Sequence, residues 1–203
     1  MQVSISVGRW TPSRVIVREL LVPALFVSVI LVTNYALSSV PNVKMFDLLV
    51  FVAGYSLGLR RGSLVAVAAW LVYGNINPWG VAPSPLLVTM MGAQIGYSVL
   101  GSLTRRFVSP DKIKRGPSRL TLALLVSALV GTLAYDFATN LYTAFFWAGI
   151  AGSMDYSRWL MTTLFGPGAV LFMVLHLGSN LVLFPVFGPL LMRASSRVDQ
   201  LAS

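Results

Sequence analysis

The sequence predicts an all-α, polytopic membrane protein: one transmembrane domain over residues 1–203, with about six helices and both termini in the cytoplasm. Three observations lead to this prediction. The chain is 56% apolar and only 10% charged, whereas soluble domains carry roughly 25% charged residues. Its mean hydropathy is +0.78, and long apolar runs recur along it. Its basic residues gather at the ends of those runs, as they do in membrane proteins.

The first apolar run covers residues 19–39, close to the roughly 20 residues that a spanning helix needs. Pro23 lies in its first turns, where proline is tolerated. Because Arg9, Arg14 and Arg18 precede the run, a cleaved signal peptide is the alternative. The run is longer than a typical signal core and further runs follow it, so we expect it to remain as the first span.

The second and third runs cover residues 46–59 and 63–77 and flank Arg60 and Arg61. Both are short for full spans. Short segments that contain glycine either tilt in the bilayer or line a cavity where neighbouring protein satisfies their backbone. Residues 74–85, rich in Gly, Pro and Asn, are expected to form a loop.

The fourth run covers residues 85–103 and contains Gly92, Gly96 and Gly101. Small residues of this kind let neighbouring helices approach closely in a membrane. We therefore expect this helix to make close contacts.

The last two runs follow the longest polar stretch, residues 105–119, which carries six Lys or Arg and must lie in water. A fifth span is expected at residues 120–148. The sixth is expected at residues 168–192, after the turn signal Gly166-Pro167-Gly168.

The orientation follows from the basic residues, because Lys and Arg near span ends are retained in the cytoplasm. With an even number of spans divided in this way, thirteen of the Lys and Arg residues lie inside, and only Lys44 and Arg158 lie outside. The thirteen are Arg9, Arg14, Arg18, Arg60, Arg61, Arg105, Arg106, Lys112, Lys114, Arg115, Arg119, Arg193 and Arg197.

The strongest candidate site lies in the fifth and sixth runs. Asp136 is about 25 Å from the cytoplasmic end of its helix at 1.5 Å per residue, which places it in the outer half of the bilayer, and Asn140 shares its face. His176, the only histidine, lies about 12 Å from the outer end of the last span, with Asn180 one turn further. The four side chains are expected to converge in a polar pocket. The alternative is that Asp136 only joins two helices.

Other polar residues are candidates for a lid over this pocket. They are Asp47 at the start of the second run and Asn75, Asn77 and Trp79 in the loop that follows the third. Each also has a purely structural explanation. Trp79 suits a membrane interface, Asp47 suits a helix N-terminus, and Asn is common in turns.

Three segments together resemble the substrate-binding S component of energy-coupling factor transporters, a prokaryotic family that takes up vitamins and other micronutrients. They are GYSLGLRRGSLVAVAAWLVYGNINPWG, AYDFATN and HLGSNLVLFPVFGPLLMR, and the resemblance covers roughly residues 15–195. It implies a multi-pass protein of the plasma membrane that captures its small-molecule substrate from outside and is not itself an enzyme.

The resemblance also implies partners. Transport would need a transmembrane coupling subunit and two ATP-binding-cassette ATPases. Members of the family dock on the coupling subunit through small residues of the first helix, and the matching positions here are Ala24 and Ser28. Serine replaces the usual second alanine. The sequence itself has no GxxxxGK[ST] loop, so energy must come from a partner or a gradient.

Two alternatives remain open. One is a membrane scaffold or assembly protein whose polar residues only join helices. The other is a membrane-embedded enzyme that uses His176 and Asp136 as an acid/base pair, although there is no second histidine and no G-x-S-x-G motif. The absence of cysteine excludes thiolate chemistry, no cofactor is expected, and the placement of the basic residues argues against nucleic acid as a partner.

Overall fold

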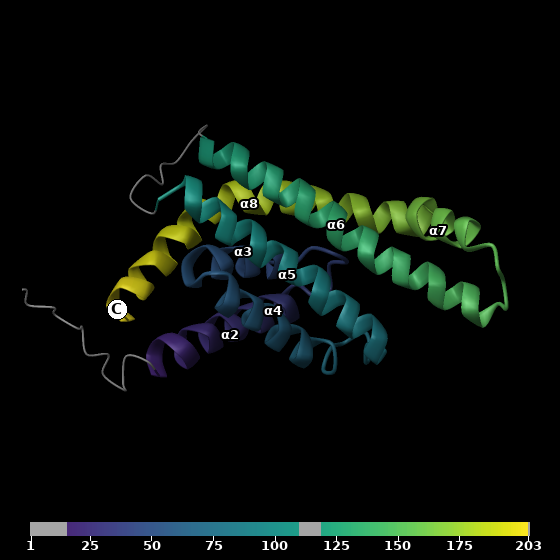
Figure 1. Cartoon of the computed structure of the whole chain (residues 1–203), viewed down its shortest axis with the longest axis horizontal. Helices are drawn as coiled ribbons and strands as arrows, with labels where there is room; N and C mark the ends of the chain where they lie inside the picture. The colour runs from purple at the N-terminus through teal and green to yellow at the C-terminus, as the bar shows by residue number, and fades with distance from the viewer. Residues whose placement is uncertain (1–15, 110–118, 203) are drawn as a thin grey trace, which may run out of the picture.

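The computed structural model describes residues 16–109 and 119–202, and all of the regular structure in these residues is helical (Figure 1). The prediction of an all-α fold is therefore confirmed for this part of the chain. Arg9, Arg14, Lys112, Lys114 and Arg115 lie outside the described residues. The elements are η1, a π-helical turn (Val17–Leu21), followed by the α-helices α2 (Val22–Ala36), α3 (Phe46–Leu57), α4 (Leu59–Tyr73), α5 (Ser84–Phe107), α6 (Arg119–Ile150), α7 (Tyr156–Phe165) and α8 (Pro167–Ala202).

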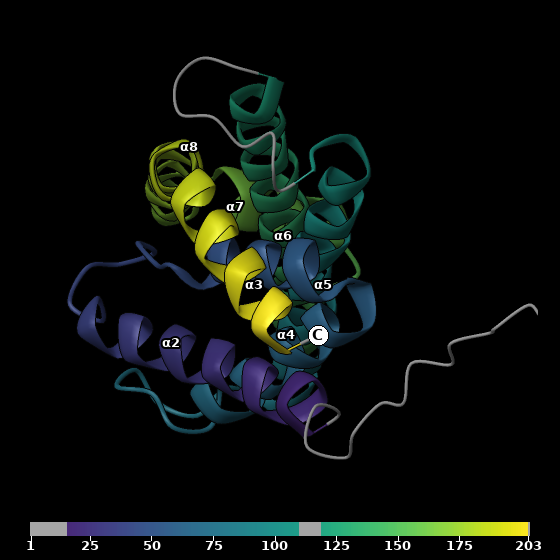
Figure 2. The ribbon, with the colours of Figure 1, turned by 90° about the vertical axis from the view of Figure 1, so that its left-hand side faces the viewer.

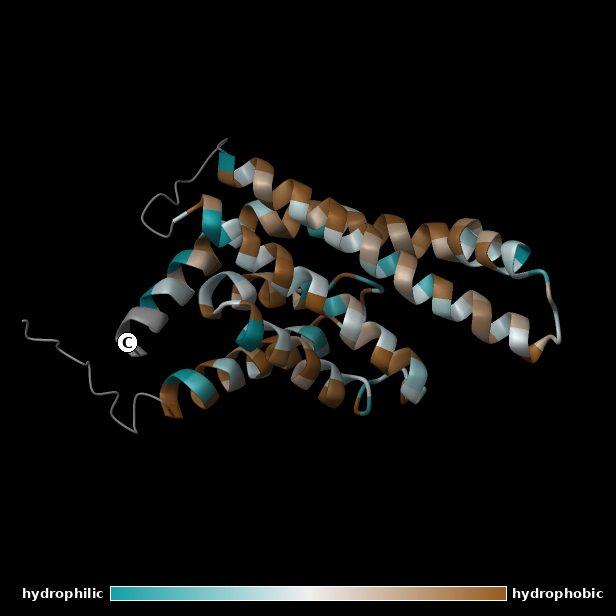
Figure 3. Cartoon of the chain, viewed as in Figure 1, coloured by the Kyte–Doolittle hydropathy of each residue, from teal (hydrophilic) through white to brown (hydrophobic). Residues whose placement is uncertain are grey.

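Four of these helices are long and apolar enough to cross a membrane: Val17–Ala36, Ser84–Phe107, Arg119–Ile150 and Pro167–Arg197. They coincide with the first, fourth, fifth and sixth predicted spans. Their outward faces carry large exposed apolar side chains such as Val32, which is 68% exposed. Figure 3 shows apolar residues over much of the length of α6 and α8. Such surfaces suit a lipid solvent.

The second and third predicted spans correspond to α3 and α4, which have 12 and 15 residues. At 1.5 Å per residue they are about 18 and 22 Å long, short of a hydrocarbon core of roughly 30 Å. The break between them is at Gly58, and α4 begins at Leu59, earlier than expected. Arg60 and Arg61 therefore lie in the first turn of α4. The described residues thus contain four helices of spanning length and one short helical pair.

α3 and α4 form a tight antiparallel hairpin. Gly58 has a φ of +84°, a left-handed conformation that glycine adopts without the steric cost of a Cβ. A Cβ on Gly62 would collide with the backbone of Gly54, so the two helices touch through their glycines. This contact returns α4 directly along α3.

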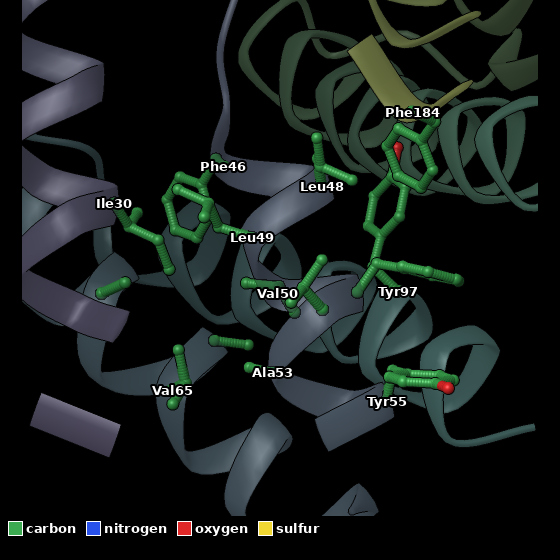
Figure 4. Packing of buried hydrophobic residues seen from close by; sticks show 14 of the residues in the cluster. Ile30, Phe46, Leu48, Leu49, Val50, Ala53, Tyr55, Val65, Tyr97 and Phe184 are labelled. Atoms are coloured by element: carbon green, nitrogen blue, oxygen red, sulfur yellow. The ribbon is translucent and has the colours of Figure 1, made fainter. Parts of the chain in front are cut away.

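α3 lies at the centre of the bundle, and all 12 of its residues are buried. It contacts α2, α4, α5 and α8. Figure 4 shows Leu49 and Val50 of α3 among Ile30, Val65 and Phe184 from the surrounding helices. A helix that is apolar on every side needs such enclosure, which explains why this run shows no polar face.

The crossing of α3 and α5 depends on glycine. A Cβ on Gly101 would overlap the carbonyl oxygen of Phe51, and one on Gly54 would overlap that of Ser98. By contrast, a Cβ on Gly92 or Gly96 would meet open space. Of the three α5 glycines expected to permit close contact, only Gly101 does so within the described residues.

The turn of the α3–α4 hairpin lies at the same end of the bundle as the start of the first span and the end of α5. The guanidinium of Arg105 donates to the carbonyl oxygen of Ser56 at 2.6 Å. The hydroxyls of Ser56 and Ser195 are 2.6 Å apart, and Arg61 forms an ion pair with Glu19. Basic residues that the sequence assigns to the cytoplasm are thus neighbours at one end.

α8 bends along its length. It contains Pro185 and Pro189, and Figures 1 and 2 both show its C-terminal part turning away from the direction of its first half. Proline removes a backbone N–H and its ring clashes with the preceding turn, so a bend at this point is expected. α8 packs against both α6 and α3: His176 in its first half contacts Asp47 of α3, and Gly188 in its second half lies next to Leu124 of α6.

α7 was not predicted from hydropathy, and Asp155 caps its N-terminus. The Asp155 carboxylate accepts hydrogen bonds from the backbone N–H of Arg158 at 3.0 Å and from the hydroxyl of Ser157 at 2.8 Å. The hydrogen bond from the Arg158 N–H, followed by that from Ser157, lowers the pKa of Asp155.

We expect Asp155→Ala to fray the first turn of α7, with several-fold faster amide exchange at Arg158, because the cap is lost. Asp155→Asn retains the cap and serves as the control. Because the folded-state pKa is depressed, the carboxylate stabilises α7 fully above its unfolded pKa of about 4 and loses this effect as the pH falls from there through the lower, folded-state pKa. Exchange at Arg158 that is the same in Asp155→Ala as in the parent chain would contradict the cap.

Candidate functional site

A cavity of about 590 Å³ lies between α3, α4, α5, α6 and α8. Its lining includes four charged or titratable side chains, Lys44, Asp47, Asp136 and His176. Four aromatic side chains also line it: Phe46, Trp70, Tyr135 and Phe172. An apolar cavity with a few converging polar groups is the usual form of a small-molecule site.

His176 of α8 bridges two carboxylates that come from different helices. Its Nδ1 lies 2.7 Å from Oδ1 of Asp136 on α6, and its Nε2 lies 2.7 Å from Oδ2 of Asp47 at the start of α3. His176 is only 8% exposed. The bridge fixes the ring and joins three helices that are distant in sequence.

The charge of this group follows from its hydrogen bonds. Each short contact between a ring nitrogen and a carboxylate oxygen needs one proton. The two protons belong either to an imidazolium between two carboxylates, or to a neutral imidazole and one carboxylic acid. In both cases the three side chains together carry a net charge of one negative unit.

Asp47 is held by further donors on its other sides. The side-chain nitrogen of Gln94 donates to Oδ1 at 2.9 Å, and that of Asn180 donates to Oδ2 at 2.8 Å. The indole N–H of Trp70 donates to the amide oxygen of Gln94 at 3.2 Å, which fixes the orientation of that amide. Because ionised carboxylates accept but do not donate, this arrangement of amide donors favours a negatively charged Asp47.

Asn180 lies beneath the cavity and connects Asp47 to a second polar group. Its side-chain nitrogen is also 2.9 Å from the hydroxyl oxygen of Thr132 on α6. The hydroxyl of Tyr97 donates to the same oxygen at 3.0 Å. These residues are fully buried, and hydrogen bonds satisfy the side-chain nitrogen of Asn180, whereas its amide oxygen has no partner among the described residues.

Asp136 has one carboxylate oxygen without a partner. Its Oδ1 accepts from His176, but its Oδ2 is buried and has no hydrogen bond among the described residues. Leaving a buried polar atom unpaired costs roughly 1–3 kcal/mol, and more for a charged group. Asp136 lines the cavity, so a ligand donor that enters beside this side chain and displaces the atoms covering Oδ2 would satisfy it.

Another part of the cavity wall is aromatic, and Lys44 lies beside it. The Lys44 ammonium lies over the rings of Tyr73 and Trp70, 5.1 and 5.9 Å from their centroids, at a distance suited to cation–π attraction. Burial lowers the pKa of Lys44, and the nearby Asp47 carboxylate partly offsets this. The rings of Trp70 and Tyr135 are nearly parallel, with an interplanar angle of 16° and centroids 6.4 Å apart.

The structure brings together most of the residues that the sequence singled out. Asp136, Asn140 and His176 line the cavity as expected, and Asn180 lies just below it. The side-chain nitrogen of Asn140 donates to the backbone oxygen of Asp136 at 2.8 Å. Asp47, expected in a lid, is instead buried within the charged group, because α3 begins inside the bundle.

The loop residues of the expected lid are not among those that line the cavity. Asn77 accepts from the backbone N–H of Trp79 at 2.9 Å and donates to the carbonyl of Gly80 at 2.6 Å. Asn75 donates to the carbonyl of Leu71 at 2.7 Å, and Trp79 is 72% exposed. The two asparagines shape the loop itself, as asparagine does in turns.

Ala24 and Ser28 lie on the exposed face of α2. The hydroxyl of Ser28 donates to the carbonyl oxygen of Ala24 at 2.9 Å, which satisfies that hydroxyl within the helix. The pair therefore presents a small, smooth surface to whatever surrounds α2.

Sequence reasoning missed Lys44, Gln94, Trp70 and Tyr135. A signal existed for two of them: Gln94 is an amide in an apolar run, and Lys44 is one of only two basic residues on the side assigned to the exterior. Trp70 and Tyr135 could not be distinguished from ordinary aromatic residues of a membrane helix.

Comparisons of this chain with protein-family models, with curated proteins and with solved structures found no match.

Proposed function

We propose that this protein captures a small polar molecule in the cavity around Asp136 and His176. It would act as the substrate-binding S component of an uptake transporter of the energy-coupling factor type, in a prokaryotic plasma membrane. The observation that carries the proposal is the unpartnered, buried Oδ2 of Asp136 beside a cavity of about 590 Å³. That volume is within the range of small-molecule sites, roughly 300–1,000 Å³.

The position of the cavity supports capture from outside the cell. Leu86 lines it near the start of α5, and Arg105 lies 19 residues further along the same helix, about 28 Å away at 1.5 Å per residue. The cavity and the cluster of Arg61 and Arg105 are thus at opposite ends of the bundle. If basic span ends face the cytoplasm, the cavity belongs to the outer half.

The need for a partner follows from the sequence and from α2. No phosphate-binding GxxxxGK[ST] loop occurs in the chain, so accumulation of a substrate would depend on a coupling subunit and two ATPases. The exposed face with Ala24 and Ser28 is our proposed docking surface for that subunit, because small residues allow helices to approach closely in a membrane.

The geometry of His176 favours binding over catalysis. A general base needs a ring nitrogen that can reach the proton it abstracts, but both nitrogens of His176 are engaged by carboxylates at 2.7 Å. An enzyme would have to break one of these bonds before its first proton transfer. A binding site needs no such step.

Binding can be tested by thermal shift on the full chain purified in detergent, with a panel of vitamins and related micronutrients. A ligand at 100 times its dissociation constant adds about 2.7 kcal/mol to the free energy of unfolding, or roughly 5–10 °C for a chain of this size. Asp136→Ala is expected to weaken binding at least about tenfold, because a hydrogen bond to a charged group is lost.

The matched control for this substitution is Asp155→Ala, which removes a carboxylate far from the cavity and should leave the ligand-induced shift unchanged. A shift that survives intact in Asp136→Ala would disprove this site. Absence of any ligand would favour a scaffold, and chemical turnover of the ligand would favour an enzyme.

A further inference from the structure

We infer that the ligand of this cavity is a zwitterion, with a cationic or donor group at Asp136, an anionic group at Lys44, and a flat ring that packs against the aromatic wall formed by Trp70 and Tyr135. The inference rests on the proposed function and specifies the class of substrate. The Asp136 carboxylate and the Lys44 ammonium line the same cavity. One oxygen of Asp136 has no hydrogen-bond partner among the described residues, and Lys44 contacts aromatic rings instead of a carboxylate.

The acceptor end is Asp136. His176 carries hydrogen bonds on both ring nitrogens, and Asp47 accepts from Gln94, Asn180 and His176. Only Oδ2 of Asp136 within this charged group is buried without a partner. Since a carboxylate oxygen is an acceptor only, the ligand group beside it must donate, and an N–H cation does so most strongly.

The cationic side chain of the cavity, which would bind the anionic group of the ligand, is Lys44. Its ammonium contacts two aromatic rings, and within residues 16–109 and 119–202 no carboxylate lies within ion-pair distance of it. Aromatic rings shield a cation but supply no hydrogen-bond acceptor oxygen. An ammonium that lines a cavity and has no carboxylate partner is complementary to an anionic ligand group.

The balance of charge favours a ligand that carries both signs over one that carries a single sign. The Asp47–His176–Asp136 group carries one negative charge, and Lys44 carries one positive charge when protonated. A ligand that is only a cation would leave Lys44 unpaired, and one that is only an anion would leave Asp136 unpaired. Desolvating an unpaired charge is costly, whereas a zwitterion pairs both.

The walls between the two ends favour a flat ring. Trp70 and Tyr135 both line the cavity, and their nearly parallel rings have centroids 6.4 Å apart, which is too close to admit a third ring between them. They form one aromatic wall, and a flat ligand group can pack against it. Parallel offset contacts between rings are favourable beyond the area that they bury. Met90 and Met173, which also line the cavity, are flexible enough to adapt to its outline.

The test uses the full chain in lipid nanodiscs and probes that differ only in charge. The probes are 3- and 4-(aminomethyl)benzoate as zwitterions, benzylamine as the cation and benzoate as the anion. We expect one zwitterion to bind at least about tenfold more tightly than either singly charged probe, since each charged contact adds at least this factor. Lys44→Met should reduce zwitterion affinity to that of benzylamine, and Asp136→Asn should reduce it to that of benzoate.

Two controls separate charge from folding. Lys44→Arg keeps the positive charge and should retain zwitterion binding. Arg158→Met removes an exposed basic residue of α7 on the same side of the bundle and should change nothing. Benzylamine binding as tightly as the zwitterions, or an unchanged affinity in Lys44→Met, would overturn the inference and leave the proposed function intact.

The outcome of the vitamin panel distinguishes the remaining cases. If a vitamin binds and is displaced by none of the four probes, the inference fails alone. If neither the vitamins nor the four probes bind to the full chain, the proposed function and the inference fail together.

Discussion

Asp47→Ala is expected to lower the free energy of unfolding by about 3–5 kcal/mol, which is the usual cost of removing one partner from a buried ion pair. The Asp47 carboxylate is 4% exposed and accepts from Gln94, Asn180 and His176. Alanine would remove the acceptor of all three donors and would leave the side-chain nitrogen of Gln94 and Nε2 of His176 unpaired in the core, while Asn180 keeps its contacts with Thr132 and Tyr97. Unfolding in detergent, followed by circular dichroism against temperature or denaturant, measures the loss.

Asp47→Asn is the matched variant, because it keeps the shape and one acceptor oxygen. We expect it to cost about 1–3 kcal/mol, as its second atom becomes a donor that faces other donors. Asp155→Ala, at the exposed start of α7, should leave the main unfolding transition in place. A chain with Asp47→Ala that unfolds together with the parent chain would show that this group does not hold α3 in the bundle.

Gly101→Ala is expected to destabilise the bundle by at least about 1–3 kcal/mol, the usual cost of overpacking. The added Cβ would overlap the carbonyl oxygen of Phe51, and backbone atoms cannot rotate away as a side chain can. α5 would have to move away from α3 along their whole contact. The unfolding assay described above measures the change.

Gly96→Ala provides a control in the same helix, five residues away. A Cβ at this position would meet open space, and alanine is about 0.8–1.0 kcal/mol more favourable than glycine inside a helix. Gly96→Ala should therefore be neutral or slightly stabilising. Equal effects of the two substitutions would mean that α3 and α5 do not cross as closely as the structure shows.

The positions of the long helices could be predicted from hydropathy alone, because each apolar run of spanning length became one helix. The length of α4 and its start at Leu59 could not be predicted in this way. Arg60 and Arg61 suggested a polar turn, whereas the actual turn is a single glycine, Gly58. α7 was missed because its apolar residues are few. Asp155 was a usable sign, as aspartate is a strongly preferred N-cap.

The candidate site was predicted where depth could be counted along one helix and missed where it depended on packing. Asp136 and His176 were placed at similar depths by their distance from span ends, and they are in contact. Asp47 was assigned to a lid because the start of its run was taken to lie at the membrane surface. Lys44 and Gln94 enter the site only through the way α3 and α5 cross, which no single-helix pattern records.

The enclosure of α3 also constrains the order in which the chain can assemble in a membrane. A helix inserts on its own when about 20 apolar residues cover the hydrocarbon thickness and satisfy the backbone. The continuous helix formed by η1 and α2 (Val17–Ala36) is long enough to do so, as are α5, α6 and α8. α3, with 12 residues, would leave its terminal backbone groups in lipid. In a membrane we therefore expect the hairpin to take its place after the long helices have inserted, and Asp47 to enter the hydrocarbon region only as its partners close around it.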